Sequence, residues 1–105
     1  MHFYIVEMKL MTRKEKVNYL ITEYEKGNYT TDVFCDQFVC VLYYEEDESI
    51  NETEYNILDE YAHIFARFSP YEEDVKSGYL LGEDKIKNEF KKLLKIWNDK
   101  TRNNR

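Results

Sequence analysis

The residues best suited to metal chemistry in this sequence are Glu60 and His63. A Glu-x-x-His motif is the spacing with which helical bundles hold paired iron ions, but such a site needs two motifs and two further carboxylates. Here the motif occurs once, and His63 is the only internal histidine. A histidine on a helix surface, near Asp59 and Glu60, is the simpler interpretation. We therefore expect no metal and no cofactor.

The two cysteines, Cys35 and Cys40, are the candidates for thiol chemistry. On one helix, residues five apart point about 140° away from each other, so these two could not form a disulfide there. No second Cys-x-x-Cys pair indicates zinc. No neighbouring cation or histidine would lower the pKa of Cys35. We expect two reduced core cysteines in a cytosolic protein. No glycine loop for phosphate is present either, so we do not expect an enzyme or a small-molecule substrate.

Charge is the strongest remaining signal, because it is sorted along the chain. Residues 45–74 carry eleven acids and one base, Arg67, a net charge of about −10. Residues 85–105 carry eight bases and two acids, about +6. Such like charge opposes folding through self-repulsion. The acids are Glu45, Glu46, Asp47, Glu48, Glu52, Glu54, Asp59, Glu60, Glu72, Glu73 and Asp74.

The acidic segment has two interpretations, a solvated face kept for solubility or a surface that binds a basic partner. Glu45–Glu48 lack the alternating ligands and the turn glycine of a calcium loop. The basic C-terminal segment would suit nucleic acid, but the overall charge of −6 opposes binding to phosphates. We expect no direct nucleic-acid contact, and the basic helix could instead pair with the acidic segment.

The elements that would position these residues are helices. With 105 residues and 43% hydrophobic content, the chain suits one domain with a modest core. One proline and three glycines leave few turn residues for a sheet-rich fold. No stretch is long and apolar enough for a membrane span.

Four amphipathic helices are predicted, each with an apolar stripe of helical period. Thr12 with Glu15, and Asn51 with Glu54, form capping boxes that begin two of them, and Thr30 or Thr31 caps a third. The run 38–44 could also be a strand, but the longer period from Val33 favours a helix. The predicted ranges are 13–26, about 31–44, about 52–68 and 83–98.

These helices predict an all-α fold, an antiparallel four-helix bundle over residues 11–98. The stripes expected in its core are Val17/Leu20/Ile21/Tyr24, Phe34/Phe38/Val41/Leu42, Leu58/Tyr61/Phe65/Phe68 and Ile86/Phe90/Leu93/Leu94/Trp97. Residues 1–10 are expected to be an N-terminal extension, either a loosely docked arm or a short edge strand. Residues 99–105 are expected to be a polar, frayed tail.

Two stretches resemble a known family. Residues 18–27 (NYLITEYEKG), followed by 34–38 (FCDQF), look like the opening of small bacterial colicin-D-type immunity proteins, which also occur in contact-dependent growth inhibition systems. Residues 66–74 (ARFSPYEED) are similar to the segment that ends their third helix. In order and length the match covers most of residues 11–97. Residues 1–10 and the basic tail depart from the pattern.

The resemblance implies a four-helix bundle that neutralises one cognate toxin, often a tRNA-cleaving nuclease, by covering its basic cleft with an acidic surface. Only Tyr71, Glu72, Glu73 and Asp74 lie in a matching motif. Charge, and tyrosine as an aromatic anchor, add the other expected partner-binding residues: Tyr44, Glu45, Glu46, Asp47, Glu48, Asp59 and Glu60. The alternative is a helical adaptor or regulator that binds another basic protein.

Overall fold

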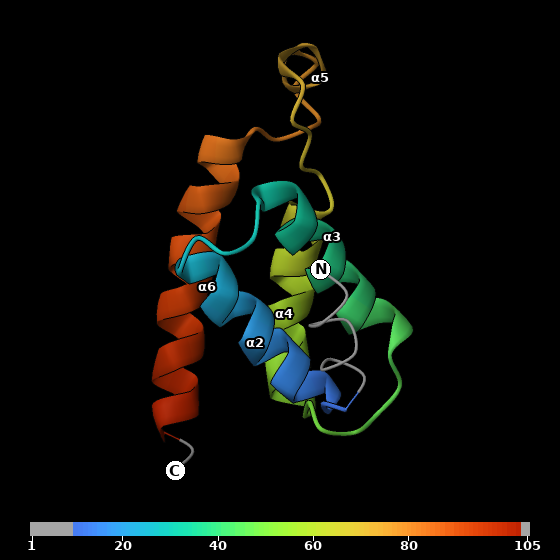
Figure 1. Cartoon of the computed structure of the whole chain (residues 1–105), viewed down its shortest axis with the longest axis vertical. Coiled ribbons are helices and arrows are strands. Elements are labelled where there is room, and N and C mark those ends of the chain that lie inside the picture. Colours follow the sequence, from blue (N-terminus) through green and yellow to red (C-terminus); the bar gives the residue numbers. More distant parts are fainter. Residues whose placement is uncertain (1–9, 104–105) are drawn as a thin grey trace.

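The structure, a computed structural model, describes residues 10–103, so the arm or edge strand expected at residues 1–10 lies almost wholly outside the described residues. The helices are α2 (Arg13–Glu25), α3 (Thr31–Tyr44), α4 (Glu52–Phe65), α5 (Glu72–Lys76) and α6 (Glu83–Asn103), and the described part contains no strand. The four long helices alternate in direction along the chain (Figure 1). The all-α prediction is confirmed.

Local capping fixes where the helices begin. Thr12 accepts a hydrogen bond from the Glu15 N–H at 3.1 Å, and the Glu15 carboxylate accepts from the Thr12 N–H at 2.8 Å. Asn51 and Glu54 form the second predicted box, and Thr30 caps α3. These side chains satisfy N–H groups that have no partner inside the helix. The predicted helix starts are therefore confirmed.

The core is built around Phe34, which is fully buried. Its ring stacks on Tyr24 of α2, with centroids 4.3 Å apart, and meets Phe65 of α4 at 5.3 Å and Phe90 of α6 at 5.2 Å. One aromatic cluster thus joins all four long helices. All the predicted stripe residues are buried except Phe68 and Leu94, which are half-buried.

Three boundaries differ from the sequence-based prediction. Helix α4, expected to reach about residue 68, ends at Phe65. Residues 72–76, expected to be loop, form the short helix α5. Helix α6 continues to Asn103, through most of the segment expected to be a frayed tail. The indole N–H of Trp97 donates to Oδ1 of Asn18 at 2.6 Å. This bond joins the C-terminal half of α6 to α2. None of the helices in residues 10–103 is long and apolar enough to cross a membrane.

Candidate acidic interface

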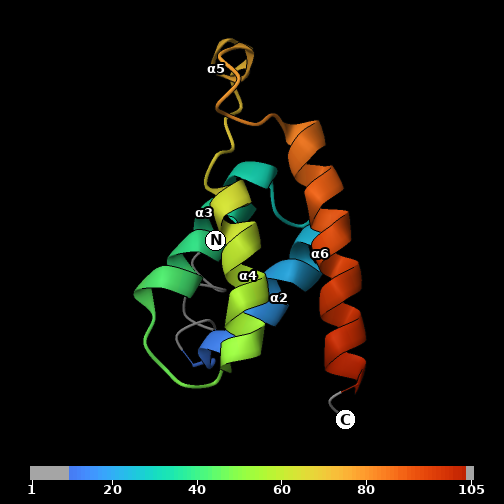
Figure 2. The ribbon, with the colours of Figure 1, turned by 180° about the vertical axis from the view of Figure 1, so that it is seen from behind.

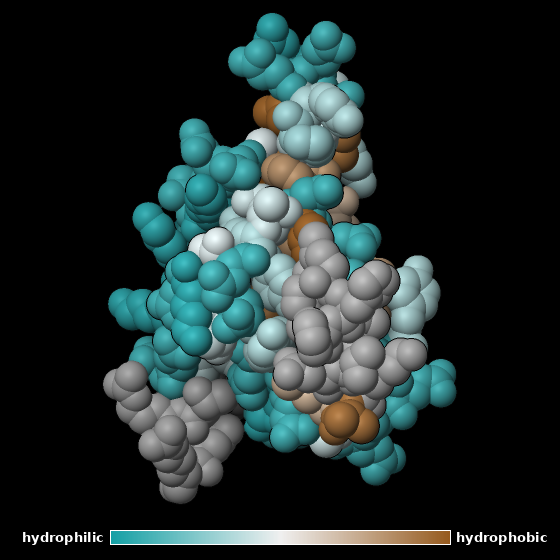
Figure 3. Space-filling view, viewed as in Figure 1, coloured by the Kyte–Doolittle hydropathy of each residue, from teal (hydrophilic) through white to brown (hydrophobic). Residues whose placement is uncertain are grey.

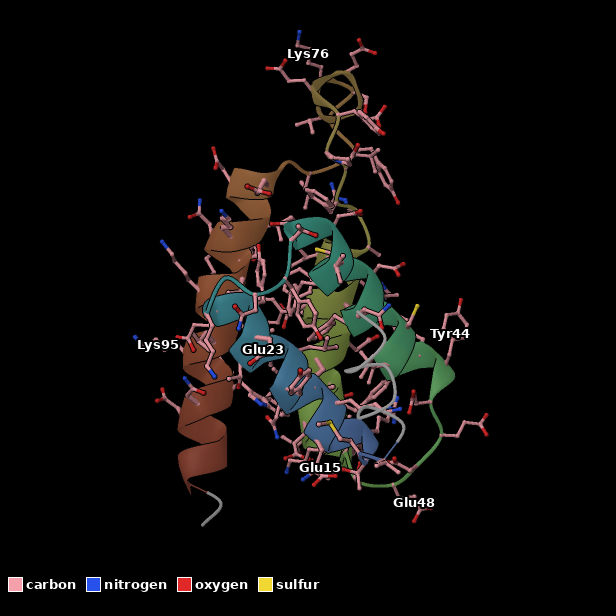
Figure 4. All side chains as sticks on the ribbon, viewed as in Figure 1. Glu15, Glu23, Tyr44, Glu48, Lys76 and Lys95 are labelled. Carbon is pink, nitrogen blue, oxygen red and sulfur yellow. The ribbon has the colours of Figure 1, made fainter. Side chains whose placement is uncertain are left out.

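The structure does not gather the predicted acidic residues on one surface. Helix α4 runs along the long axis, so the α3–α4 connection, residues 45–51, lies at one end and α5 at the other (Figures 1 and 2). Figure 4 shows Glu48 at the lower end and Lys76 of α5 at the upper end. The long axis measures 42 Å. The predicted acidic surface is therefore two separate patches, with Asp59 and Glu60 on α4 between them.

At the lower end, two of the four consecutive acids are used inside the fold. Asp47 accepts the N–H of Arg13, the first residue of α2, at 2.8 Å. Ser49 donates to Asp47 and accepts the N–H of Lys14 at 2.9 Å. With the Thr12–Glu15 box, these bonds satisfy the first N–H groups of α2. Hydrogen bonds from Ser49 and Arg13 hold the pKa of Asp47 below its usual value.

Glu45 is also engaged, because both of its carboxylate oxygens lie 2.7 Å from Nζ of the buried Lys16. Glu46 and Glu48 are exposed and have no ion-pair partner among the described residues. Tyr44 is 79% exposed and points away from the bundle (Figure 4). The lower end therefore offers two carboxylates and one tyrosine to a partner, while Glu45 and Asp47 serve folding.

Between the two ends, Asp59 accepts a hydrogen bond from the Tyr43 hydroxyl at 2.6 Å. His63 Nε2 lies 3.5 Å from the same carboxylate. Partial burial and this bond to Asp59 raise the pKa of Tyr43. Glu60 is exposed. The bond between Tyr43 and Asp59 cross-links α3 and α4 at the surface.

At the upper end, residues 69–82 form a loop that projects beyond the bundle and carries α5 (Figure 1). We call these residues the projecting loop. Its ends are joined, since the Leu81 N–H donates to the Arg67 carbonyl at 2.7 Å and the Ser69 N–H donates to the Leu81 carbonyl at 2.9 Å. A surface loop of this length with paired ends is an Ω-loop, a class that is frequently functional.

Internal contacts give the projecting loop a defined shape. The hydroxyl of the buried Ser69 donates to Asp74 at 2.7 Å and accepts the Tyr71 N–H at 3.1 Å. Arg67 donates to the Tyr79 carbonyl at 2.8 Å. Gly78 has a φ of +88°, a left-handed conformation that favours glycine and turns the chain after α5.

The outer surface of the projecting loop is acidic and aromatic. Glu72 and Glu73 are exposed, and neither has an ion-pair partner among the described residues. Tyr71 and Tyr79 are 67% and 68% exposed, and Lys76 is the loop's one cation. Figure 3 shows a hydrophilic tip with hydrophobic surface gathered directly below it. Exposed tyrosine rings are frequent anchors in protein–protein interfaces, and the exposed carboxylates make this surface negatively charged.

The lysines of α6 do not neutralise these patches. Their described ion pairs lie within the helix: Lys85 and Lys92 both contact Glu89, at 3.3 and 3.0 Å, and Lys87 contacts Glu83 at 3.3 Å. Lys95 lies on the outer face of α6 (Figure 4). The predicted pairing between the basic helix and the acidic segment is not seen among the described residues.

Among residues 10–103, no three His, Cys, Asp or Glu side chains form a cluster suited to a metal. Both cysteines are free thiols, and burial raises the pKa of Cys35 to about 12. A thiol that stays protonated is a poor nucleophile. What this surface can do chemically is bind, through carboxylates and tyrosine rings.

Sequence reasoning missed two features of the candidate interface. The first is the contact between Arg67 and Tyr79, which fixes the shape of the projecting loop. The second is helix α5, which is too short, at five residues, to show a helical period in the sequence. A signal was present, because Pro70 and Gly78 bracket residues that are too polar for the core.

Comparison with protein-family models, with curated proteins and with solved structures found no match.

Proposed function

We propose that this protein is an immunity protein that binds the basic nuclease domain of a cognate bacterial toxin through the projecting loop and thereby blocks its active-site cleft. The observation that carries the proposal is the pair Glu72 and Glu73, exposed and unpaired among the described residues, on a loop that stands clear of the bundle. Tyr71 and Tyr79 flank them as exposed aromatic anchors.

Shape and charge both favour a concave basic partner. A nuclease cleft binds polyphosphate, so lysine and arginine line it, and a projecting carboxylate pair meets it with complementary charge. Such complementarity raises the association rate and fixes the register of the complex. The loop's internal bonds add affinity, because a surface that is already ordered loses less entropy on binding.

The resemblance supports the same end of the molecule. We call the pairing of Arg67 and Ser69 with Leu81 the neck of the projecting loop. Residues 66–74, which are similar to a segment of the colicin-D-type immunity proteins, include the outgoing side of this neck and the first three residues of α5. The acids at the lower end have no such support, and Glu45 and Asp47 already bind residues of α2. We therefore place the partner-binding surface at Tyr71, Glu72, Glu73 and Tyr79, with Asp74 holding the loop in shape.

The test needs the cognate toxin, which this proposal expects to be encoded next to the gene of this chain. It measures cleavage of tRNA by the purified toxin domain in the presence of this protein. The wild-type protein should inhibit at a 1:1 ratio. The double variant Glu72→Lys/Glu73→Lys should bind at least about 100-fold more weakly, because it places like charges in the cleft. Its circular dichroism spectrum should match the wild type.

The matched control is Glu46→Lys/Glu48→Lys, which changes the net charge by the same amount at the opposite end of the molecule. It should bind within about threefold of the wild type, because exposed charges more than a Debye length away, about 10 Å at 0.1 M salt, are screened. If this variant loses inhibition and the loop variant keeps it, the lower patch is the interface. If Lys91→Glu/Lys95→Glu alone loses inhibition, α6 is the interface.

Binding of a basic protein that is not a nuclease would select the alternative, a helical adaptor. In that case the protein would bind this partner through the projecting loop, yet tRNA cleavage by the toxin nuclease domain would continue in its presence. With either partner, the association rate should fall as salt rises.

A further inference from the structure

A hollow of about 530 Å³ lies between the projecting loop and the start of α6. Ligand-binding hollows in proteins usually measure about 300–1,000 Å³. Apart from Phe68, which precedes the loop, and Glu83, the first residue of α6, the lining belongs to the projecting loop: Ser69, Pro70, Tyr71, Glu72, Val75 and Gly82. It therefore lies on the loop that the proposed function uses, and it faces the junction with the bundle.

The lining combines an apolar wall with carboxylates and contains no cation. Phe68, Pro70 and Val75 supply carbon surface, and Glu72 and Glu83 supply negative charge. Hydrogen bonds from Thr31 and Lys87 keep the pKa of Glu83 below its usual value, so it stays ionised at neutral pH. Lys87, 3.3 Å from Glu83, already offsets part of that charge. Glu72 is the carboxylate left for a ligand.

Gly82 keeps one side of the hollow open. A Cβ atom at this position would lie 3.6 Å from a methyl carbon of Val75, in ordinary van der Waals contact. Any larger side chain here would take up space beside Val75. The backbone of Gly82 is not in the left-handed region, so glycine is not required there for conformational reasons.

We propose that this hollow receives one arginine side chain of the protein partner. The three methylene groups of arginine would pack on Val75, Pro70 and Phe68, while its guanidinium reaches Glu72. A planar guanidinium can bind a carboxylate through two parallel hydrogen bonds, and it also stacks on aromatic rings such as that of the exposed Tyr71. An acidic or purely apolar side chain would leave Glu72 unpaired. This inference rests on the proposed function.

The experiment is a nuclear magnetic resonance titration of the full chain with the peptide acetyl-Gly-Arg-Gly-amide. The amide signals of Val75 and Gly82 should move and saturate. The matching citrulline peptide has nearly the same shape without the charge, and it should bind about tenfold more weakly, the expected loss of a charge-assisted hydrogen bond. Glu72→Gln should reduce binding of the arginine peptide by a similar factor.

Two further variants distinguish the effect of a carboxylate's charge from the effect of the hollow's size. Glu46→Gln removes an exposed carboxylate at the opposite end of the molecule that does not line the hollow, and it should leave peptide binding unchanged. Gly82→Thr narrows the hollow at constant charge, and threonine is tolerated about as well as glycine before a helix, so this variant should fold but not bind the peptide. Absence of saturable shifts, or equal binding of the citrulline peptide, would overturn the inference.

These results are distinguishable from those of the nuclease test. If the peptide does not bind but Glu72→Lys/Glu73→Lys still abolishes inhibition, the proposed function stands and the arginine site is wrong. If the peptide binds at the hollow but the wild-type protein does not inhibit the nuclease domain, the arginine site stands and the proposed function is wrong.

Discussion

Arg67 holds Tyr79 in two ways. Its Nε donates to the Tyr79 carbonyl oxygen at 2.8 Å, and its guanidinium carbon lies 5.1 Å from the centroid of the Tyr79 ring. Arg67 precedes the projecting loop and Tyr79 lies near the loop's end. The pair therefore ties the departing chain to the returning chain, beside the backbone bonds of the neck.

Arg67→Ala should loosen the projecting loop without unfolding the bundle. The lost hydrogen bond and cation–π contact are each worth about 0.5–1 kcal/mol at an exposed site, so amide exchange at residues 79–81 should be about tenfold faster. Hydrogen exchange followed by nuclear magnetic resonance measures this. The core amides of α3 should be unchanged. Equal exchange at residues 79–81 in both proteins would mean that the neck alone orders the loop.

Phe34→Ala should be among the most destabilising single changes. It removes a fully buried ring that packs against rings from the other three long helices, so unfolding should require about 3–5 kcal/mol less free energy. Phe65→Ala and Phe90→Ala, in the same cluster, should cost a similar amount. Urea denaturation measures the loss. Ile96→Ala, at an exposed position, should stay within about 0.5 kcal/mol of the wild type.

Asp47 should make stability depend on acid pH. Its pKa is lower in the folded chain than the ordinary value of 3.8, so the folded state favours the ionised carboxylate. The stabilisation is fully present above that value, and it is lost as the pH falls through the lower folded pKa. Asp47→Asn should lower the urea midpoint at pH 6, and the difference from the wild type should shrink by pH 2.

The control for Asp47 is Glu48→Gln, one residue along the same connection. Glu48 is exposed and makes no bond to α2 among the described contacts, so its removal should leave both the urea midpoint and its pH dependence nearly unchanged. If the two variants behave alike, the bond from Asp47 to the Arg13 N–H does not stabilise the fold.

Cys35 should resist alkylation in the native protein. With its pKa at about 12, only about one thiol in ten thousand is ionised at pH 8, and the thiolate is the reactive form. Iodoacetamide labelling followed by mass spectrometry should modify Cys35 only after denaturation. Fast labelling of native Cys35 would contradict this prediction and would show that α3 opens locally to expose the thiol.

The sequence predicted those parts of the fold that depend on neighbouring residues. Thr12 with Glu15 and Asn51 with Glu54 are three positions apart, so both capping boxes could be recognised without tertiary information. The apolar stripes likewise identified most of the core, because burial follows helical period. The stack of Tyr24 on Phe34 could not be predicted, since it depends on how two helices pack.

The candidate interface was less predictable, because charge along a chain does not specify position in space. Glu48 and Glu72 belong to one acidic segment, yet the 14-residue helix α4 between them carries the chain about 21 Å along the long axis. The bond from Asp47 to the Arg13 N–H also spans 34 positions in the sequence. Whether an acid serves folding or remains exposed depends on such distant contacts.

The paired neck of the projecting loop separates the surface residues at the tip of the loop from the core residues that hold the bundle together. Because Arg67, Ser69 and Leu81 close the neck through backbone atoms, the exposed residues Glu72, Glu73 and Lys76 can change identity without altering the groups that close it. The aromatic cluster around Phe34 lies in the bundle and makes none of these contacts. Substitutions at the tip can therefore accumulate without disturbing the packing of the four long helices.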